Sequence, residues 1–149
     1  MSVATDDLTL EITRHFDALP TRVFNAWLNR DEFQSWIGLE GICCEVPLFE
    51  PRVGGSYRIA MRTSTGEIVP VTGTFRAIEP PSRLVLTWRW GDDPARHSLI
   101  TLTFRAKGDG TDMTLHQEGL GSREFRDGNE RGWSNTFNKL ARHVTGGQP

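Results

Sequence analysis

Residues 8–36, LTLEITRHFDALPTRVFNAWLNRDEFQSW, change from a strand-like to a helix-like pattern of apolar side chains. From Leu8 onward apolar and polar residues alternate, which is the pattern of a half-buried strand. Pro20 suits the first turn of a helix, and the apolar residues after it recur at helical spacing. A second short helix, with Asp31 as its N-cap, is expected to bury Trp36. The sequence therefore predicts a strand followed by two short helices at the start of the chain.

The middle of the chain consists of further strand-like segments separated by turn-forming residues. Clusters of glycine, proline, serine and aspartate lie between the segments, and each can reverse an antiparallel strand. The predicted strands span residues 42–49, 56–62, 69–78, 83–90, 97–106 and 111–118. Because the links between them are short, an antiparallel meander is the simplest topology.

The last part of the sequence returns to helical spacing. Its apolar residues fall on one helical face and are Trp133, Phe137, Leu140, Ala141 and Val144. The helix is expected to begin either at Asp127, which has capping-box spacing to Glu130, or earlier at Ser122. A helix with one apolar face needs a partner, so we expect it to pack against the sheet.

Length and composition favour one globular domain. The chain has 149 residues, of which 37% are hydrophobic and 24% are charged, as in a typical folded domain. We expect residues 8–145 to form this domain. The remaining segments are expected to be a disordered N-terminus at 1–7 and a flexible tail at 146–149.

Charge and cysteine usage narrow the classes of partner and compartment. The net charge is −2 at pH 7 and the sequence has no basic stripe, which argues against nucleic-acid binding. No apolar run reaches the roughly 18 residues of a membrane span, and the first residues do not resemble a signal peptide. Cys43 and Cys44 are adjacent, a spacing that does not form an ordinary disulfide. We interpret them as reduced thiols of a cytoplasmic protein.

Several short motifs, in their order along the chain, resemble one known family. They are VFNAWLNRDEFQSW at 23–36, GGSYR at 54–58, Gly73 followed by PPSRL at 80–84 and Trp88, and the pair Gly132 and Trp133. This set resembles the activator-of-Hsp90-ATPase-like (AHSA1-like) family of the START-like, polyketide-cyclase-like (SRPBCC) superfamily. The resemblance implies an α+β helix-grip fold, in which a curved antiparallel sheet wraps around the long C-terminal helix. It does not fix an activity, because one fold supports many functions.

The sequence departs from the family pattern at positions near the last helix. Many relatives carry a histidine a few residues before the Gly-Trp pair, where this chain has Asn129. Many also carry a leucine at the position where this chain has Phe137. The first change removes a titratable group, and the second is expected to narrow or reshape the space beneath the helix.

The apolar side of each strand gives a candidate ligand pocket on the concave face of the sheet. Aromatic side chains and methionine are frequent there, as in pockets for flat, apolar ligands. The candidate pocket residues are Arg14, Trp36, Tyr57, Ile59, Met61, Phe75, Leu86, Trp88, Leu102, Phe104, Met113, Leu115, Gln117, Phe125, Gly132, Trp133 and Phe137. Phe125, Gly128 and Gly132 share a helical stripe, and the two glycines are expected to leave a gap.

Arg14 and Gln117 are the polar members of this set. Either is expected to orient a carbonyl or carboxylate of the ligand, because polar groups on an inner face need partners. A stripe of this kind also describes an ordinary core, and Arg14 also fits a strand-end residue paired at the surface.

The favoured function is that of a small hydrophobic-ligand binding protein. No catalytic, metal-binding or nucleotide-binding motif is found, so we expect no cofactor and no metal site. One alternative, which the family resemblance implies, is a protein-interaction module that acts on a chaperone ATPase. Another is a cyclase-, hydrolase- or lyase-type enzyme that uses the same pocket with residues from distant strands. We expect a monomer or a homodimer.

Overall fold

The computed structural model describes residues 8–92 and 97–145. The order of elements is a strand, two helices, six strands and a long helix, as the sequence predicts. The elements are β1 (Thr9–Phe16), α1 (Pro20–Leu28), α2 (Arg30–Trp36), β2 (Glu45–Phe49), β3 (Ser56–Arg62), β4 (Ile68–Glu79), β5 (Arg83–Trp90), β6 (His97–Lys107), β7 (Gly110–Glu118) and α3 (Arg123–Thr145). The segments 1–7, predicted to be disordered, and 146–149, predicted to be a flexible tail, lie outside the described residues.

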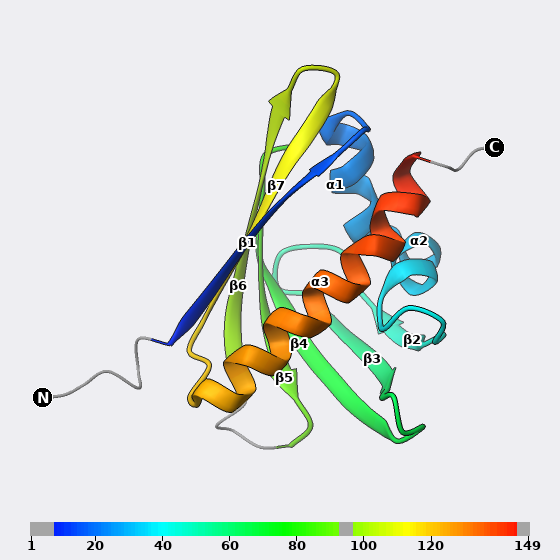
Figure 1. Cartoon of the computed structure of the whole chain (residues 1–149), viewed down its shortest axis with the longest axis vertical. Coiled ribbons are helices and arrows are strands. Elements are labelled where there is room, and N and C mark those ends of the chain that lie inside the picture. Colours follow the sequence, from blue (N-terminus) through cyan, green and yellow to red (C-terminus); the bar gives the residue numbers. More distant parts are fainter. Residues whose placement is uncertain (1–7, 93–96, 146–149) are drawn as a thin grey trace, which may run out of the picture.

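The seven strands form one antiparallel sheet in the order β1-β7-β6-β5-β4-β3-β2. Strands β2 to β7 are a meander, and β1 joins it by pairing with β7. The long helix α3 runs across one face of the twisted sheet, and α1 and α2 lie beside its C-terminal half (Figure 1). This arrangement is the expected α+β helix-grip fold. Among the described residues, no helix is both long enough and apolar enough to cross a membrane.

Local hydrogen bonds decide where two of the helices begin. Asn29 caps α2 instead of Asp31, because its Oδ1 accepts the Glu32 backbone N–H at 3.0 Å. Asp31 lies in the first turn, where the helix dipole favours a negative charge. The Ser122 Oγ accepts the Phe125 backbone N–H at 3.1 Å, so the earlier of the two predicted starts of α3 is correct.

The core lies between the sheet and α3, and α1 and α2 add aromatic side chains at one end. The rings of Trp27 and Trp36 meet edge to face, with centroids 4.7 Å apart. Phe137 of α3 contacts Trp27 at 6.3 Å and Phe16 of β1 at 6.5 Å between centroids. Burial of one such side chain contributes about 1.5–3 kcal/mol, so this cluster is a principal source of stability.

One close approach within the sheet depends on glycine. Gly73 of β4 lies opposite Tyr57 of β3. A Cβ at position 73 would lie 2.5 Å from the Tyr57 Oη and 2.0 Å from the carbonyl oxygen of Thr87 on β5. The Tyr57 hydroxyl donates a hydrogen bond to that carbonyl, and burial raises the pKa of Tyr57 well above its ordinary value. The tyrosine therefore stays protonated and links three strands across the glycine.

Candidate functional site

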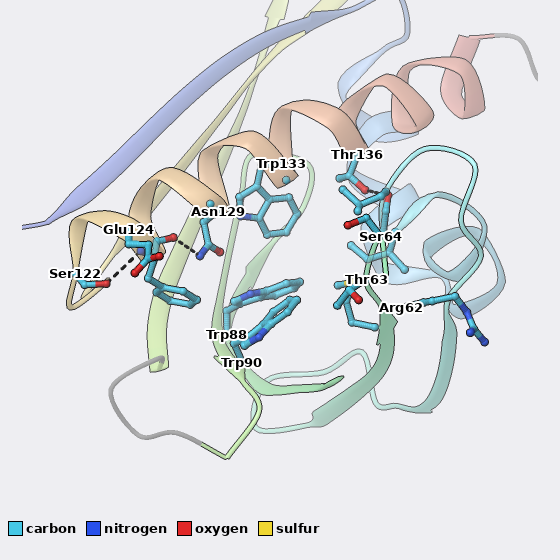
Figure 2. Close-up of a pocket in the computed structure, with 17 residues that line it drawn as sticks. Arg62, Thr63, Ser64, Trp88, Trp90, Ser122, Glu124, Asn129, Trp133 and Thr136 are labelled. Atoms are coloured by element: carbon cyan, nitrogen blue, oxygen red, sulfur yellow. Dashed lines mark hydrogen bonds between the residues drawn. The ribbon is translucent and has the colours of Figure 1, made fainter. Parts of the chain in front are cut away.

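A cavity of about 400 Å³ lies between the N-terminal half of α3 and the sheet. This volume is within the range of about 300–1,000 Å³ that small-molecule sites have. The cavity reaches solvent at a rim that includes the exposed residues Arg62, Ser64, Ser122 and Glu124 (Figure 2). The complete lining is Ile37, Gly38, Leu39, Met61, Arg62, Thr63, Ser64, Trp88, Trp90, Ser122, Glu124, Phe125, Gly128, Asn129, Gly132, Trp133 and Thr136.

Tryptophan side chains form much of the apolar wall. Trp88 of β5 and Trp133 of α3 have ring centroids 4.8 Å apart and planes inclined at 52°. Trp90, the last residue of β5, lies next to Trp88 on the same wall (Figure 2). The faces of such rings bind flat apolar groups and also attract cations.

Two lining positions on α3 carry no side chain. A Cβ at Gly132 would meet no atom within 4 Å, and a Cβ at Gly128 would meet only the Arg131 Nη2, at 3.9 Å. A larger side chain at Gly132 would therefore occupy the cavity. Glycine inside a helix costs roughly 0.5–1 kcal/mol relative to alanine, so the space is kept at a cost in stability.

A network of amides lies behind the cavity wall. The Trp133 indole N–H donates to the Gln117 Oε1 at 3.0 Å, and the Gln117 Nε2 donates to the Ser98 Oγ at 2.7 Å and to the Asn129 Oδ1 at 3.4 Å. The Asn129 Nδ2 donates to the carbonyl oxygen of Phe125 at 2.8 Å. An asparagine amide has two N–H donors, and the second of Asn129 has no partner among the described residues. Asn129 therefore offers the cavity a neutral donor.

The wall formed by the loop after α2 is bound to α3. The Lys139 Nζ donates to the carbonyl oxygens of Ile37, Leu39 and Ile42 at 3.4, 3.3 and 2.8 Å. Burial lowers the pKa of Lys139. Residues 42–44, predicted as the start of a strand, remain in this loop, and β2 begins at Glu45.

The structure brings only part of the predicted pocket together around the cavity. The predicted residues that line it are Met61, Trp88, Phe125, Gly132 and Trp133. The other apolar candidates are buried in the core and do not line it; they are Trp36, Tyr57, Ile59, Phe75, Leu86, Leu102, Phe104, Met113, Leu115 and Phe137. Among the described residues, the inner face of the sheet is thus mostly core, and the cavity lies beneath the N-terminal half of α3.

The polar candidates Arg14 and Gln117 also lie outside the lining. The Arg14 Nη1 donates to the Asn138 Oδ1 at 2.7 Å, and the guanidinium lies 5.9 Å from the centroid of the Phe16 ring. Arg14 therefore binds the C-terminal half of α3, away from the cavity. Gln117 is fully buried, and its amide is engaged with other side chains. In this structure neither side chain is placed to orient a ligand.

Several residues that line the cavity were not among the pocket residues predicted from the sequence. Thr136 lies four residues after Gly132, so helical spacing was a signal for it. Its hydroxyl donates to the carbonyl oxygen of Gly38. The loop residues 37–39 and 63–64 carry no local signal for a place in the lining, because their positions depend on contacts with distant elements.

Ionisable groups of the described lining are confined to Glu124 and Arg62. Arg62 points away from the cavity (Figure 2). Within the described part of the chain, no group of three or more histidine, cysteine, aspartate or glutamate side chains is placed to hold a metal ion. Both cysteines are free, with Cys43 exposed and Cys44 buried. The cavity therefore supplies shape, aromatic surface and neutral hydrogen-bonding groups.

A serine, a histidine and a glutamate meet at the junction of α2 and α3, outside the cavity. The His143 Nε2 lies 2.8 Å from the Glu32 Oε1, and the His143 Nδ1 lies 3.3 Å from the Ser35 Oγ. The Ser35 hydroxyl donates to the carbonyl oxygen of Glu32 at 2.6 Å, so its hydrogen is already engaged. A catalytic serine needs a base aligned with its hydroxyl and a space for substrate. We interpret this cluster as a structural link between the two helices.

Replacing Glu32 with glutamine is expected to lower the free energy of unfolding by about 1–2 kcal/mol at neutral pH, because Glu32 accepts charged hydrogen bonds. Burial raises the pKa of Glu32, but hydrogen bonds from Arg22 and His143 outweigh it and hold the pKa below its ordinary value of 4.5. This stabilisation is present above pH 4.5 and is lost as the pH falls through the folded-state pKa. Urea unfolding of both proteins is the measurement. A difference that persisted undiminished at about pH 3 would contradict this account.

Solved structures of bacterial proteins share this fold. The chain is similar to protein CV1439 from Chromobacterium violaceum, with 28% identity over 91% of this chain and 96% of that chain and a TM-score of 0.81. It is similar to protein Ms6760 from Mycobacterium smegmatis, with 21% identity over 98% and 96% of the two chains and a TM-score of 0.84. For the AHSA1 protein SPO3351 from Silicibacter pomeroyi the identity is 25% over 92% and 97%, with a TM-score of 0.76.

No functionally curated protein matches the sequence significantly. The sequence profile described as activator of Hsp90 ATPase homolog 1-like protein matches residues 17–145. This range includes every motif quoted above, as well as α3 and the cavity beneath it. The chain therefore belongs to the activator of Hsp90 ATPase homolog 1-like protein family.

Proposed function

We propose that the protein binds a small hydrophobic ligand in the cavity beneath the N-terminal half of α3. The observation that carries this proposal is the empty space at Gly132 beside Trp88 and Trp133. A leucine at position 132 would favour the helix and bury more apolar area, so stability alone would favour filling the space. Glycine there is accounted for if the space is occupied by a ligand.

The alternatives have less support from particular residues. Asn129 stands where many relatives carry a histidine, so the cavity has a neutral amide at this position in place of a titratable group. The large apolar side chains that the described surface exposes are Leu19, Leu48, Val53 and Ile68, which come from separate segments of the chain. They do not single out a surface for a chaperone. A cytoplasmic location and a monomeric or homodimeric state stay predictions.

The substitution Gly132→Leu is expected to weaken binding of 2-naphthylmethanol, a flat neutral probe, by at least about tenfold, because the leucine takes the probe's place. The same variant is expected to be more stable than the wild type by about 0.8–1 kcal/mol without ligand, since leucine is the better helix former. Isothermal titration calorimetry measures the binding, and thermal unfolding measures the stability.

The matched control is Ser134→Leu, which places the same side chain on the exposed outer face of α3. This variant is expected to bind the probe as the wild type does. Unchanged binding by a folded Gly132→Leu protein would place the ligand elsewhere. Native mass spectrometry of the freshly purified wild type would show whether it retains a natural ligand. Such a ligand would also raise the melting temperature, because it binds the folded state.

A further inference from the structure

We propose that the cavity selects a flat ligand whose polar end is neutral or positively charged, and that it excludes carboxylates. This inference rests on the proposed function and narrows the class of ligand. It differs from the expectation based on the sequence, in which Arg14 was a candidate partner for a ligand carboxylate. The placement of cations and carboxylates around the cavity favours this selection.

Arg62, which lines the cavity, and the buried or half-buried cations Lys139 and Arg14 are all directed elsewhere. The Arg62 guanidinium points away from the cavity (Figure 2). The Lys139 Nζ is held by loop carbonyl oxygens, with its shortest bond at 2.8 Å to Ile42, and Lys139 does not line the cavity. Arg14 is bound to Asn138 at 2.7 Å. No cation of the described lining is therefore placed to meet a carboxylate inside the cavity.

An unpaired carboxylate would lose its hydration on entering such a site. Burial of an ionised group without a partner is costly, and a neutral amide does not compensate for it. Asn129 offers an N–H donor to the cavity, which suits a carbonyl or hydroxyl oxygen of a neutral ligand. The part of the cavity beside Asn129 is thus matched to uncharged polar groups.

The rim favours positive charge. Glu124 is exposed in the first turn of α3 and lines the cavity. The faces of Trp88 and Trp133 in the cavity wall also attract cations, so both the rim and the wall favour an ammonium group over a carboxylate. A carboxylate in the same place would be repelled by Glu124.

The test uses probes that share one ring system and differ only in charge: 2-naphthylmethanol, protonated 2-naphthylmethylamine and 2-naphthoate. Isothermal titration calorimetry with the full chain at neutral pH and low salt is expected to show binding of the alcohol and the amine. Binding of 2-naphthoate is expected to be at least about tenfold weaker, because its charge is desolvated without a partner. Its affinity is expected to rise as the pH is lowered toward the pKa of its own carboxyl group.

The outcomes separate this inference from the proposed function. If 2-naphthoate binds as tightly as the alcohol, and Gly132→Leu weakens both, the cavity binds ligands and the charge selection is wrong. If no probe binds more tightly to the wild type than to Gly132→Leu, the proposed function itself fails, and this inference fails with it.

Glu124→Gln tests the part that the rim plays. It is expected to lower the ratio of amine affinity to alcohol affinity by about two- to fivefold, the effect of one exposed charge pair, and to leave alcohol binding unchanged. Glu45→Gln is the matched control, because Glu45 is exposed on β2 and does not line the cavity. An unchanged ratio in Glu124→Gln, or an equal decrease in Glu45→Gln, would overturn the role of Glu124.

Discussion

Replacing Trp133 with alanine is expected to lower the free energy of unfolding by about 3–5 kcal/mol, as for other buried aromatic residues. The side chain is 4% exposed, and its ring lies 4.8 Å from Trp88, 5.5 Å from Phe137 and 6.0 Å from Trp27 between centroids. Its indole N–H is also the donor to the buried Gln117 Oε1. The variant therefore loses packing and leaves an acceptor without its partner. Urea denaturation measures the change.

Trp133→Phe separates these contributions, because it keeps an aromatic ring and removes the donor. Its expected loss is about 1–3 kcal/mol, the cost of one unsatisfied buried polar group. A Trp133→Ala protein as stable as the wild type would show that the ring is not part of the core. Because Trp133 has both a core role and a place in the cavity wall, loss of ligand binding in Trp133→Ala alone does not locate the pocket. Gly132→Leu locates it more directly.

Gly73→Ala is expected to destabilise the protein by about 3 kcal/mol or more, at the upper end of what overpacking costs. The added Cβ would lie 2.0 Å from the Thr87 carbonyl oxygen, which belongs to the backbone of the adjacent strand. The strand has to move, and the hydrogen bond from the Tyr57 hydroxyl to that carbonyl is strained as well. Thermal and urea unfolding of the variant measure the loss.

Gly132→Ala is the matched control for this prediction, since it makes the same chemical change at a glycine with open space around it. It is expected to stabilise the protein by about 0.8–1 kcal/mol, because alanine is the best helix former and glycine a poor one. The two substitutions are thus expected to have opposite signs. Equal effects would mean that the close approach at Gly73 does not constrain the sheet.

Most of the fold could be predicted from the sequence because its patterns are local. Alternation from Leu8 onward marks β1, and the spacing from Trp133 to Val144 marks α3. Boundaries were less predictable where a distant residue decides them. Lys139 holds the Ile42 carbonyl oxygen, and the strand that the sequence extends back to residue 42 begins only at Glu45.

The candidate site was harder to predict, for a geometric reason. Strand alternation shows which side chains face α3, but it does not show where α3 stands away from the sheet. Leu102 and Met113 are fully buried core residues, whereas Trp88 borders open space. The glycine stripe predicted the position of the cavity better than strand alternation did, because Gly132 marks a place where the helix itself leaves space. The loop walls follow from long-range hydrogen bonds that no local pattern encodes.

The tryptophan rings form an unbroken series from α2 to the cavity wall. Centroid separations are 4.7 Å from Trp36 to Trp27, 6.0 Å from Trp27 to Trp133 and 4.8 Å from Trp133 to Trp88. Electronic excitation passes between indoles at such short range faster than it is emitted as light, so these residues fluoresce as a coupled set. A bound molecule that accepts excitation from Trp88 or Trp133 would quench the fluorescence of all four coupled tryptophans. The protein's own ultraviolet emission is therefore expected to report, without a label, when a ligand that accepts excitation occupies the cavity.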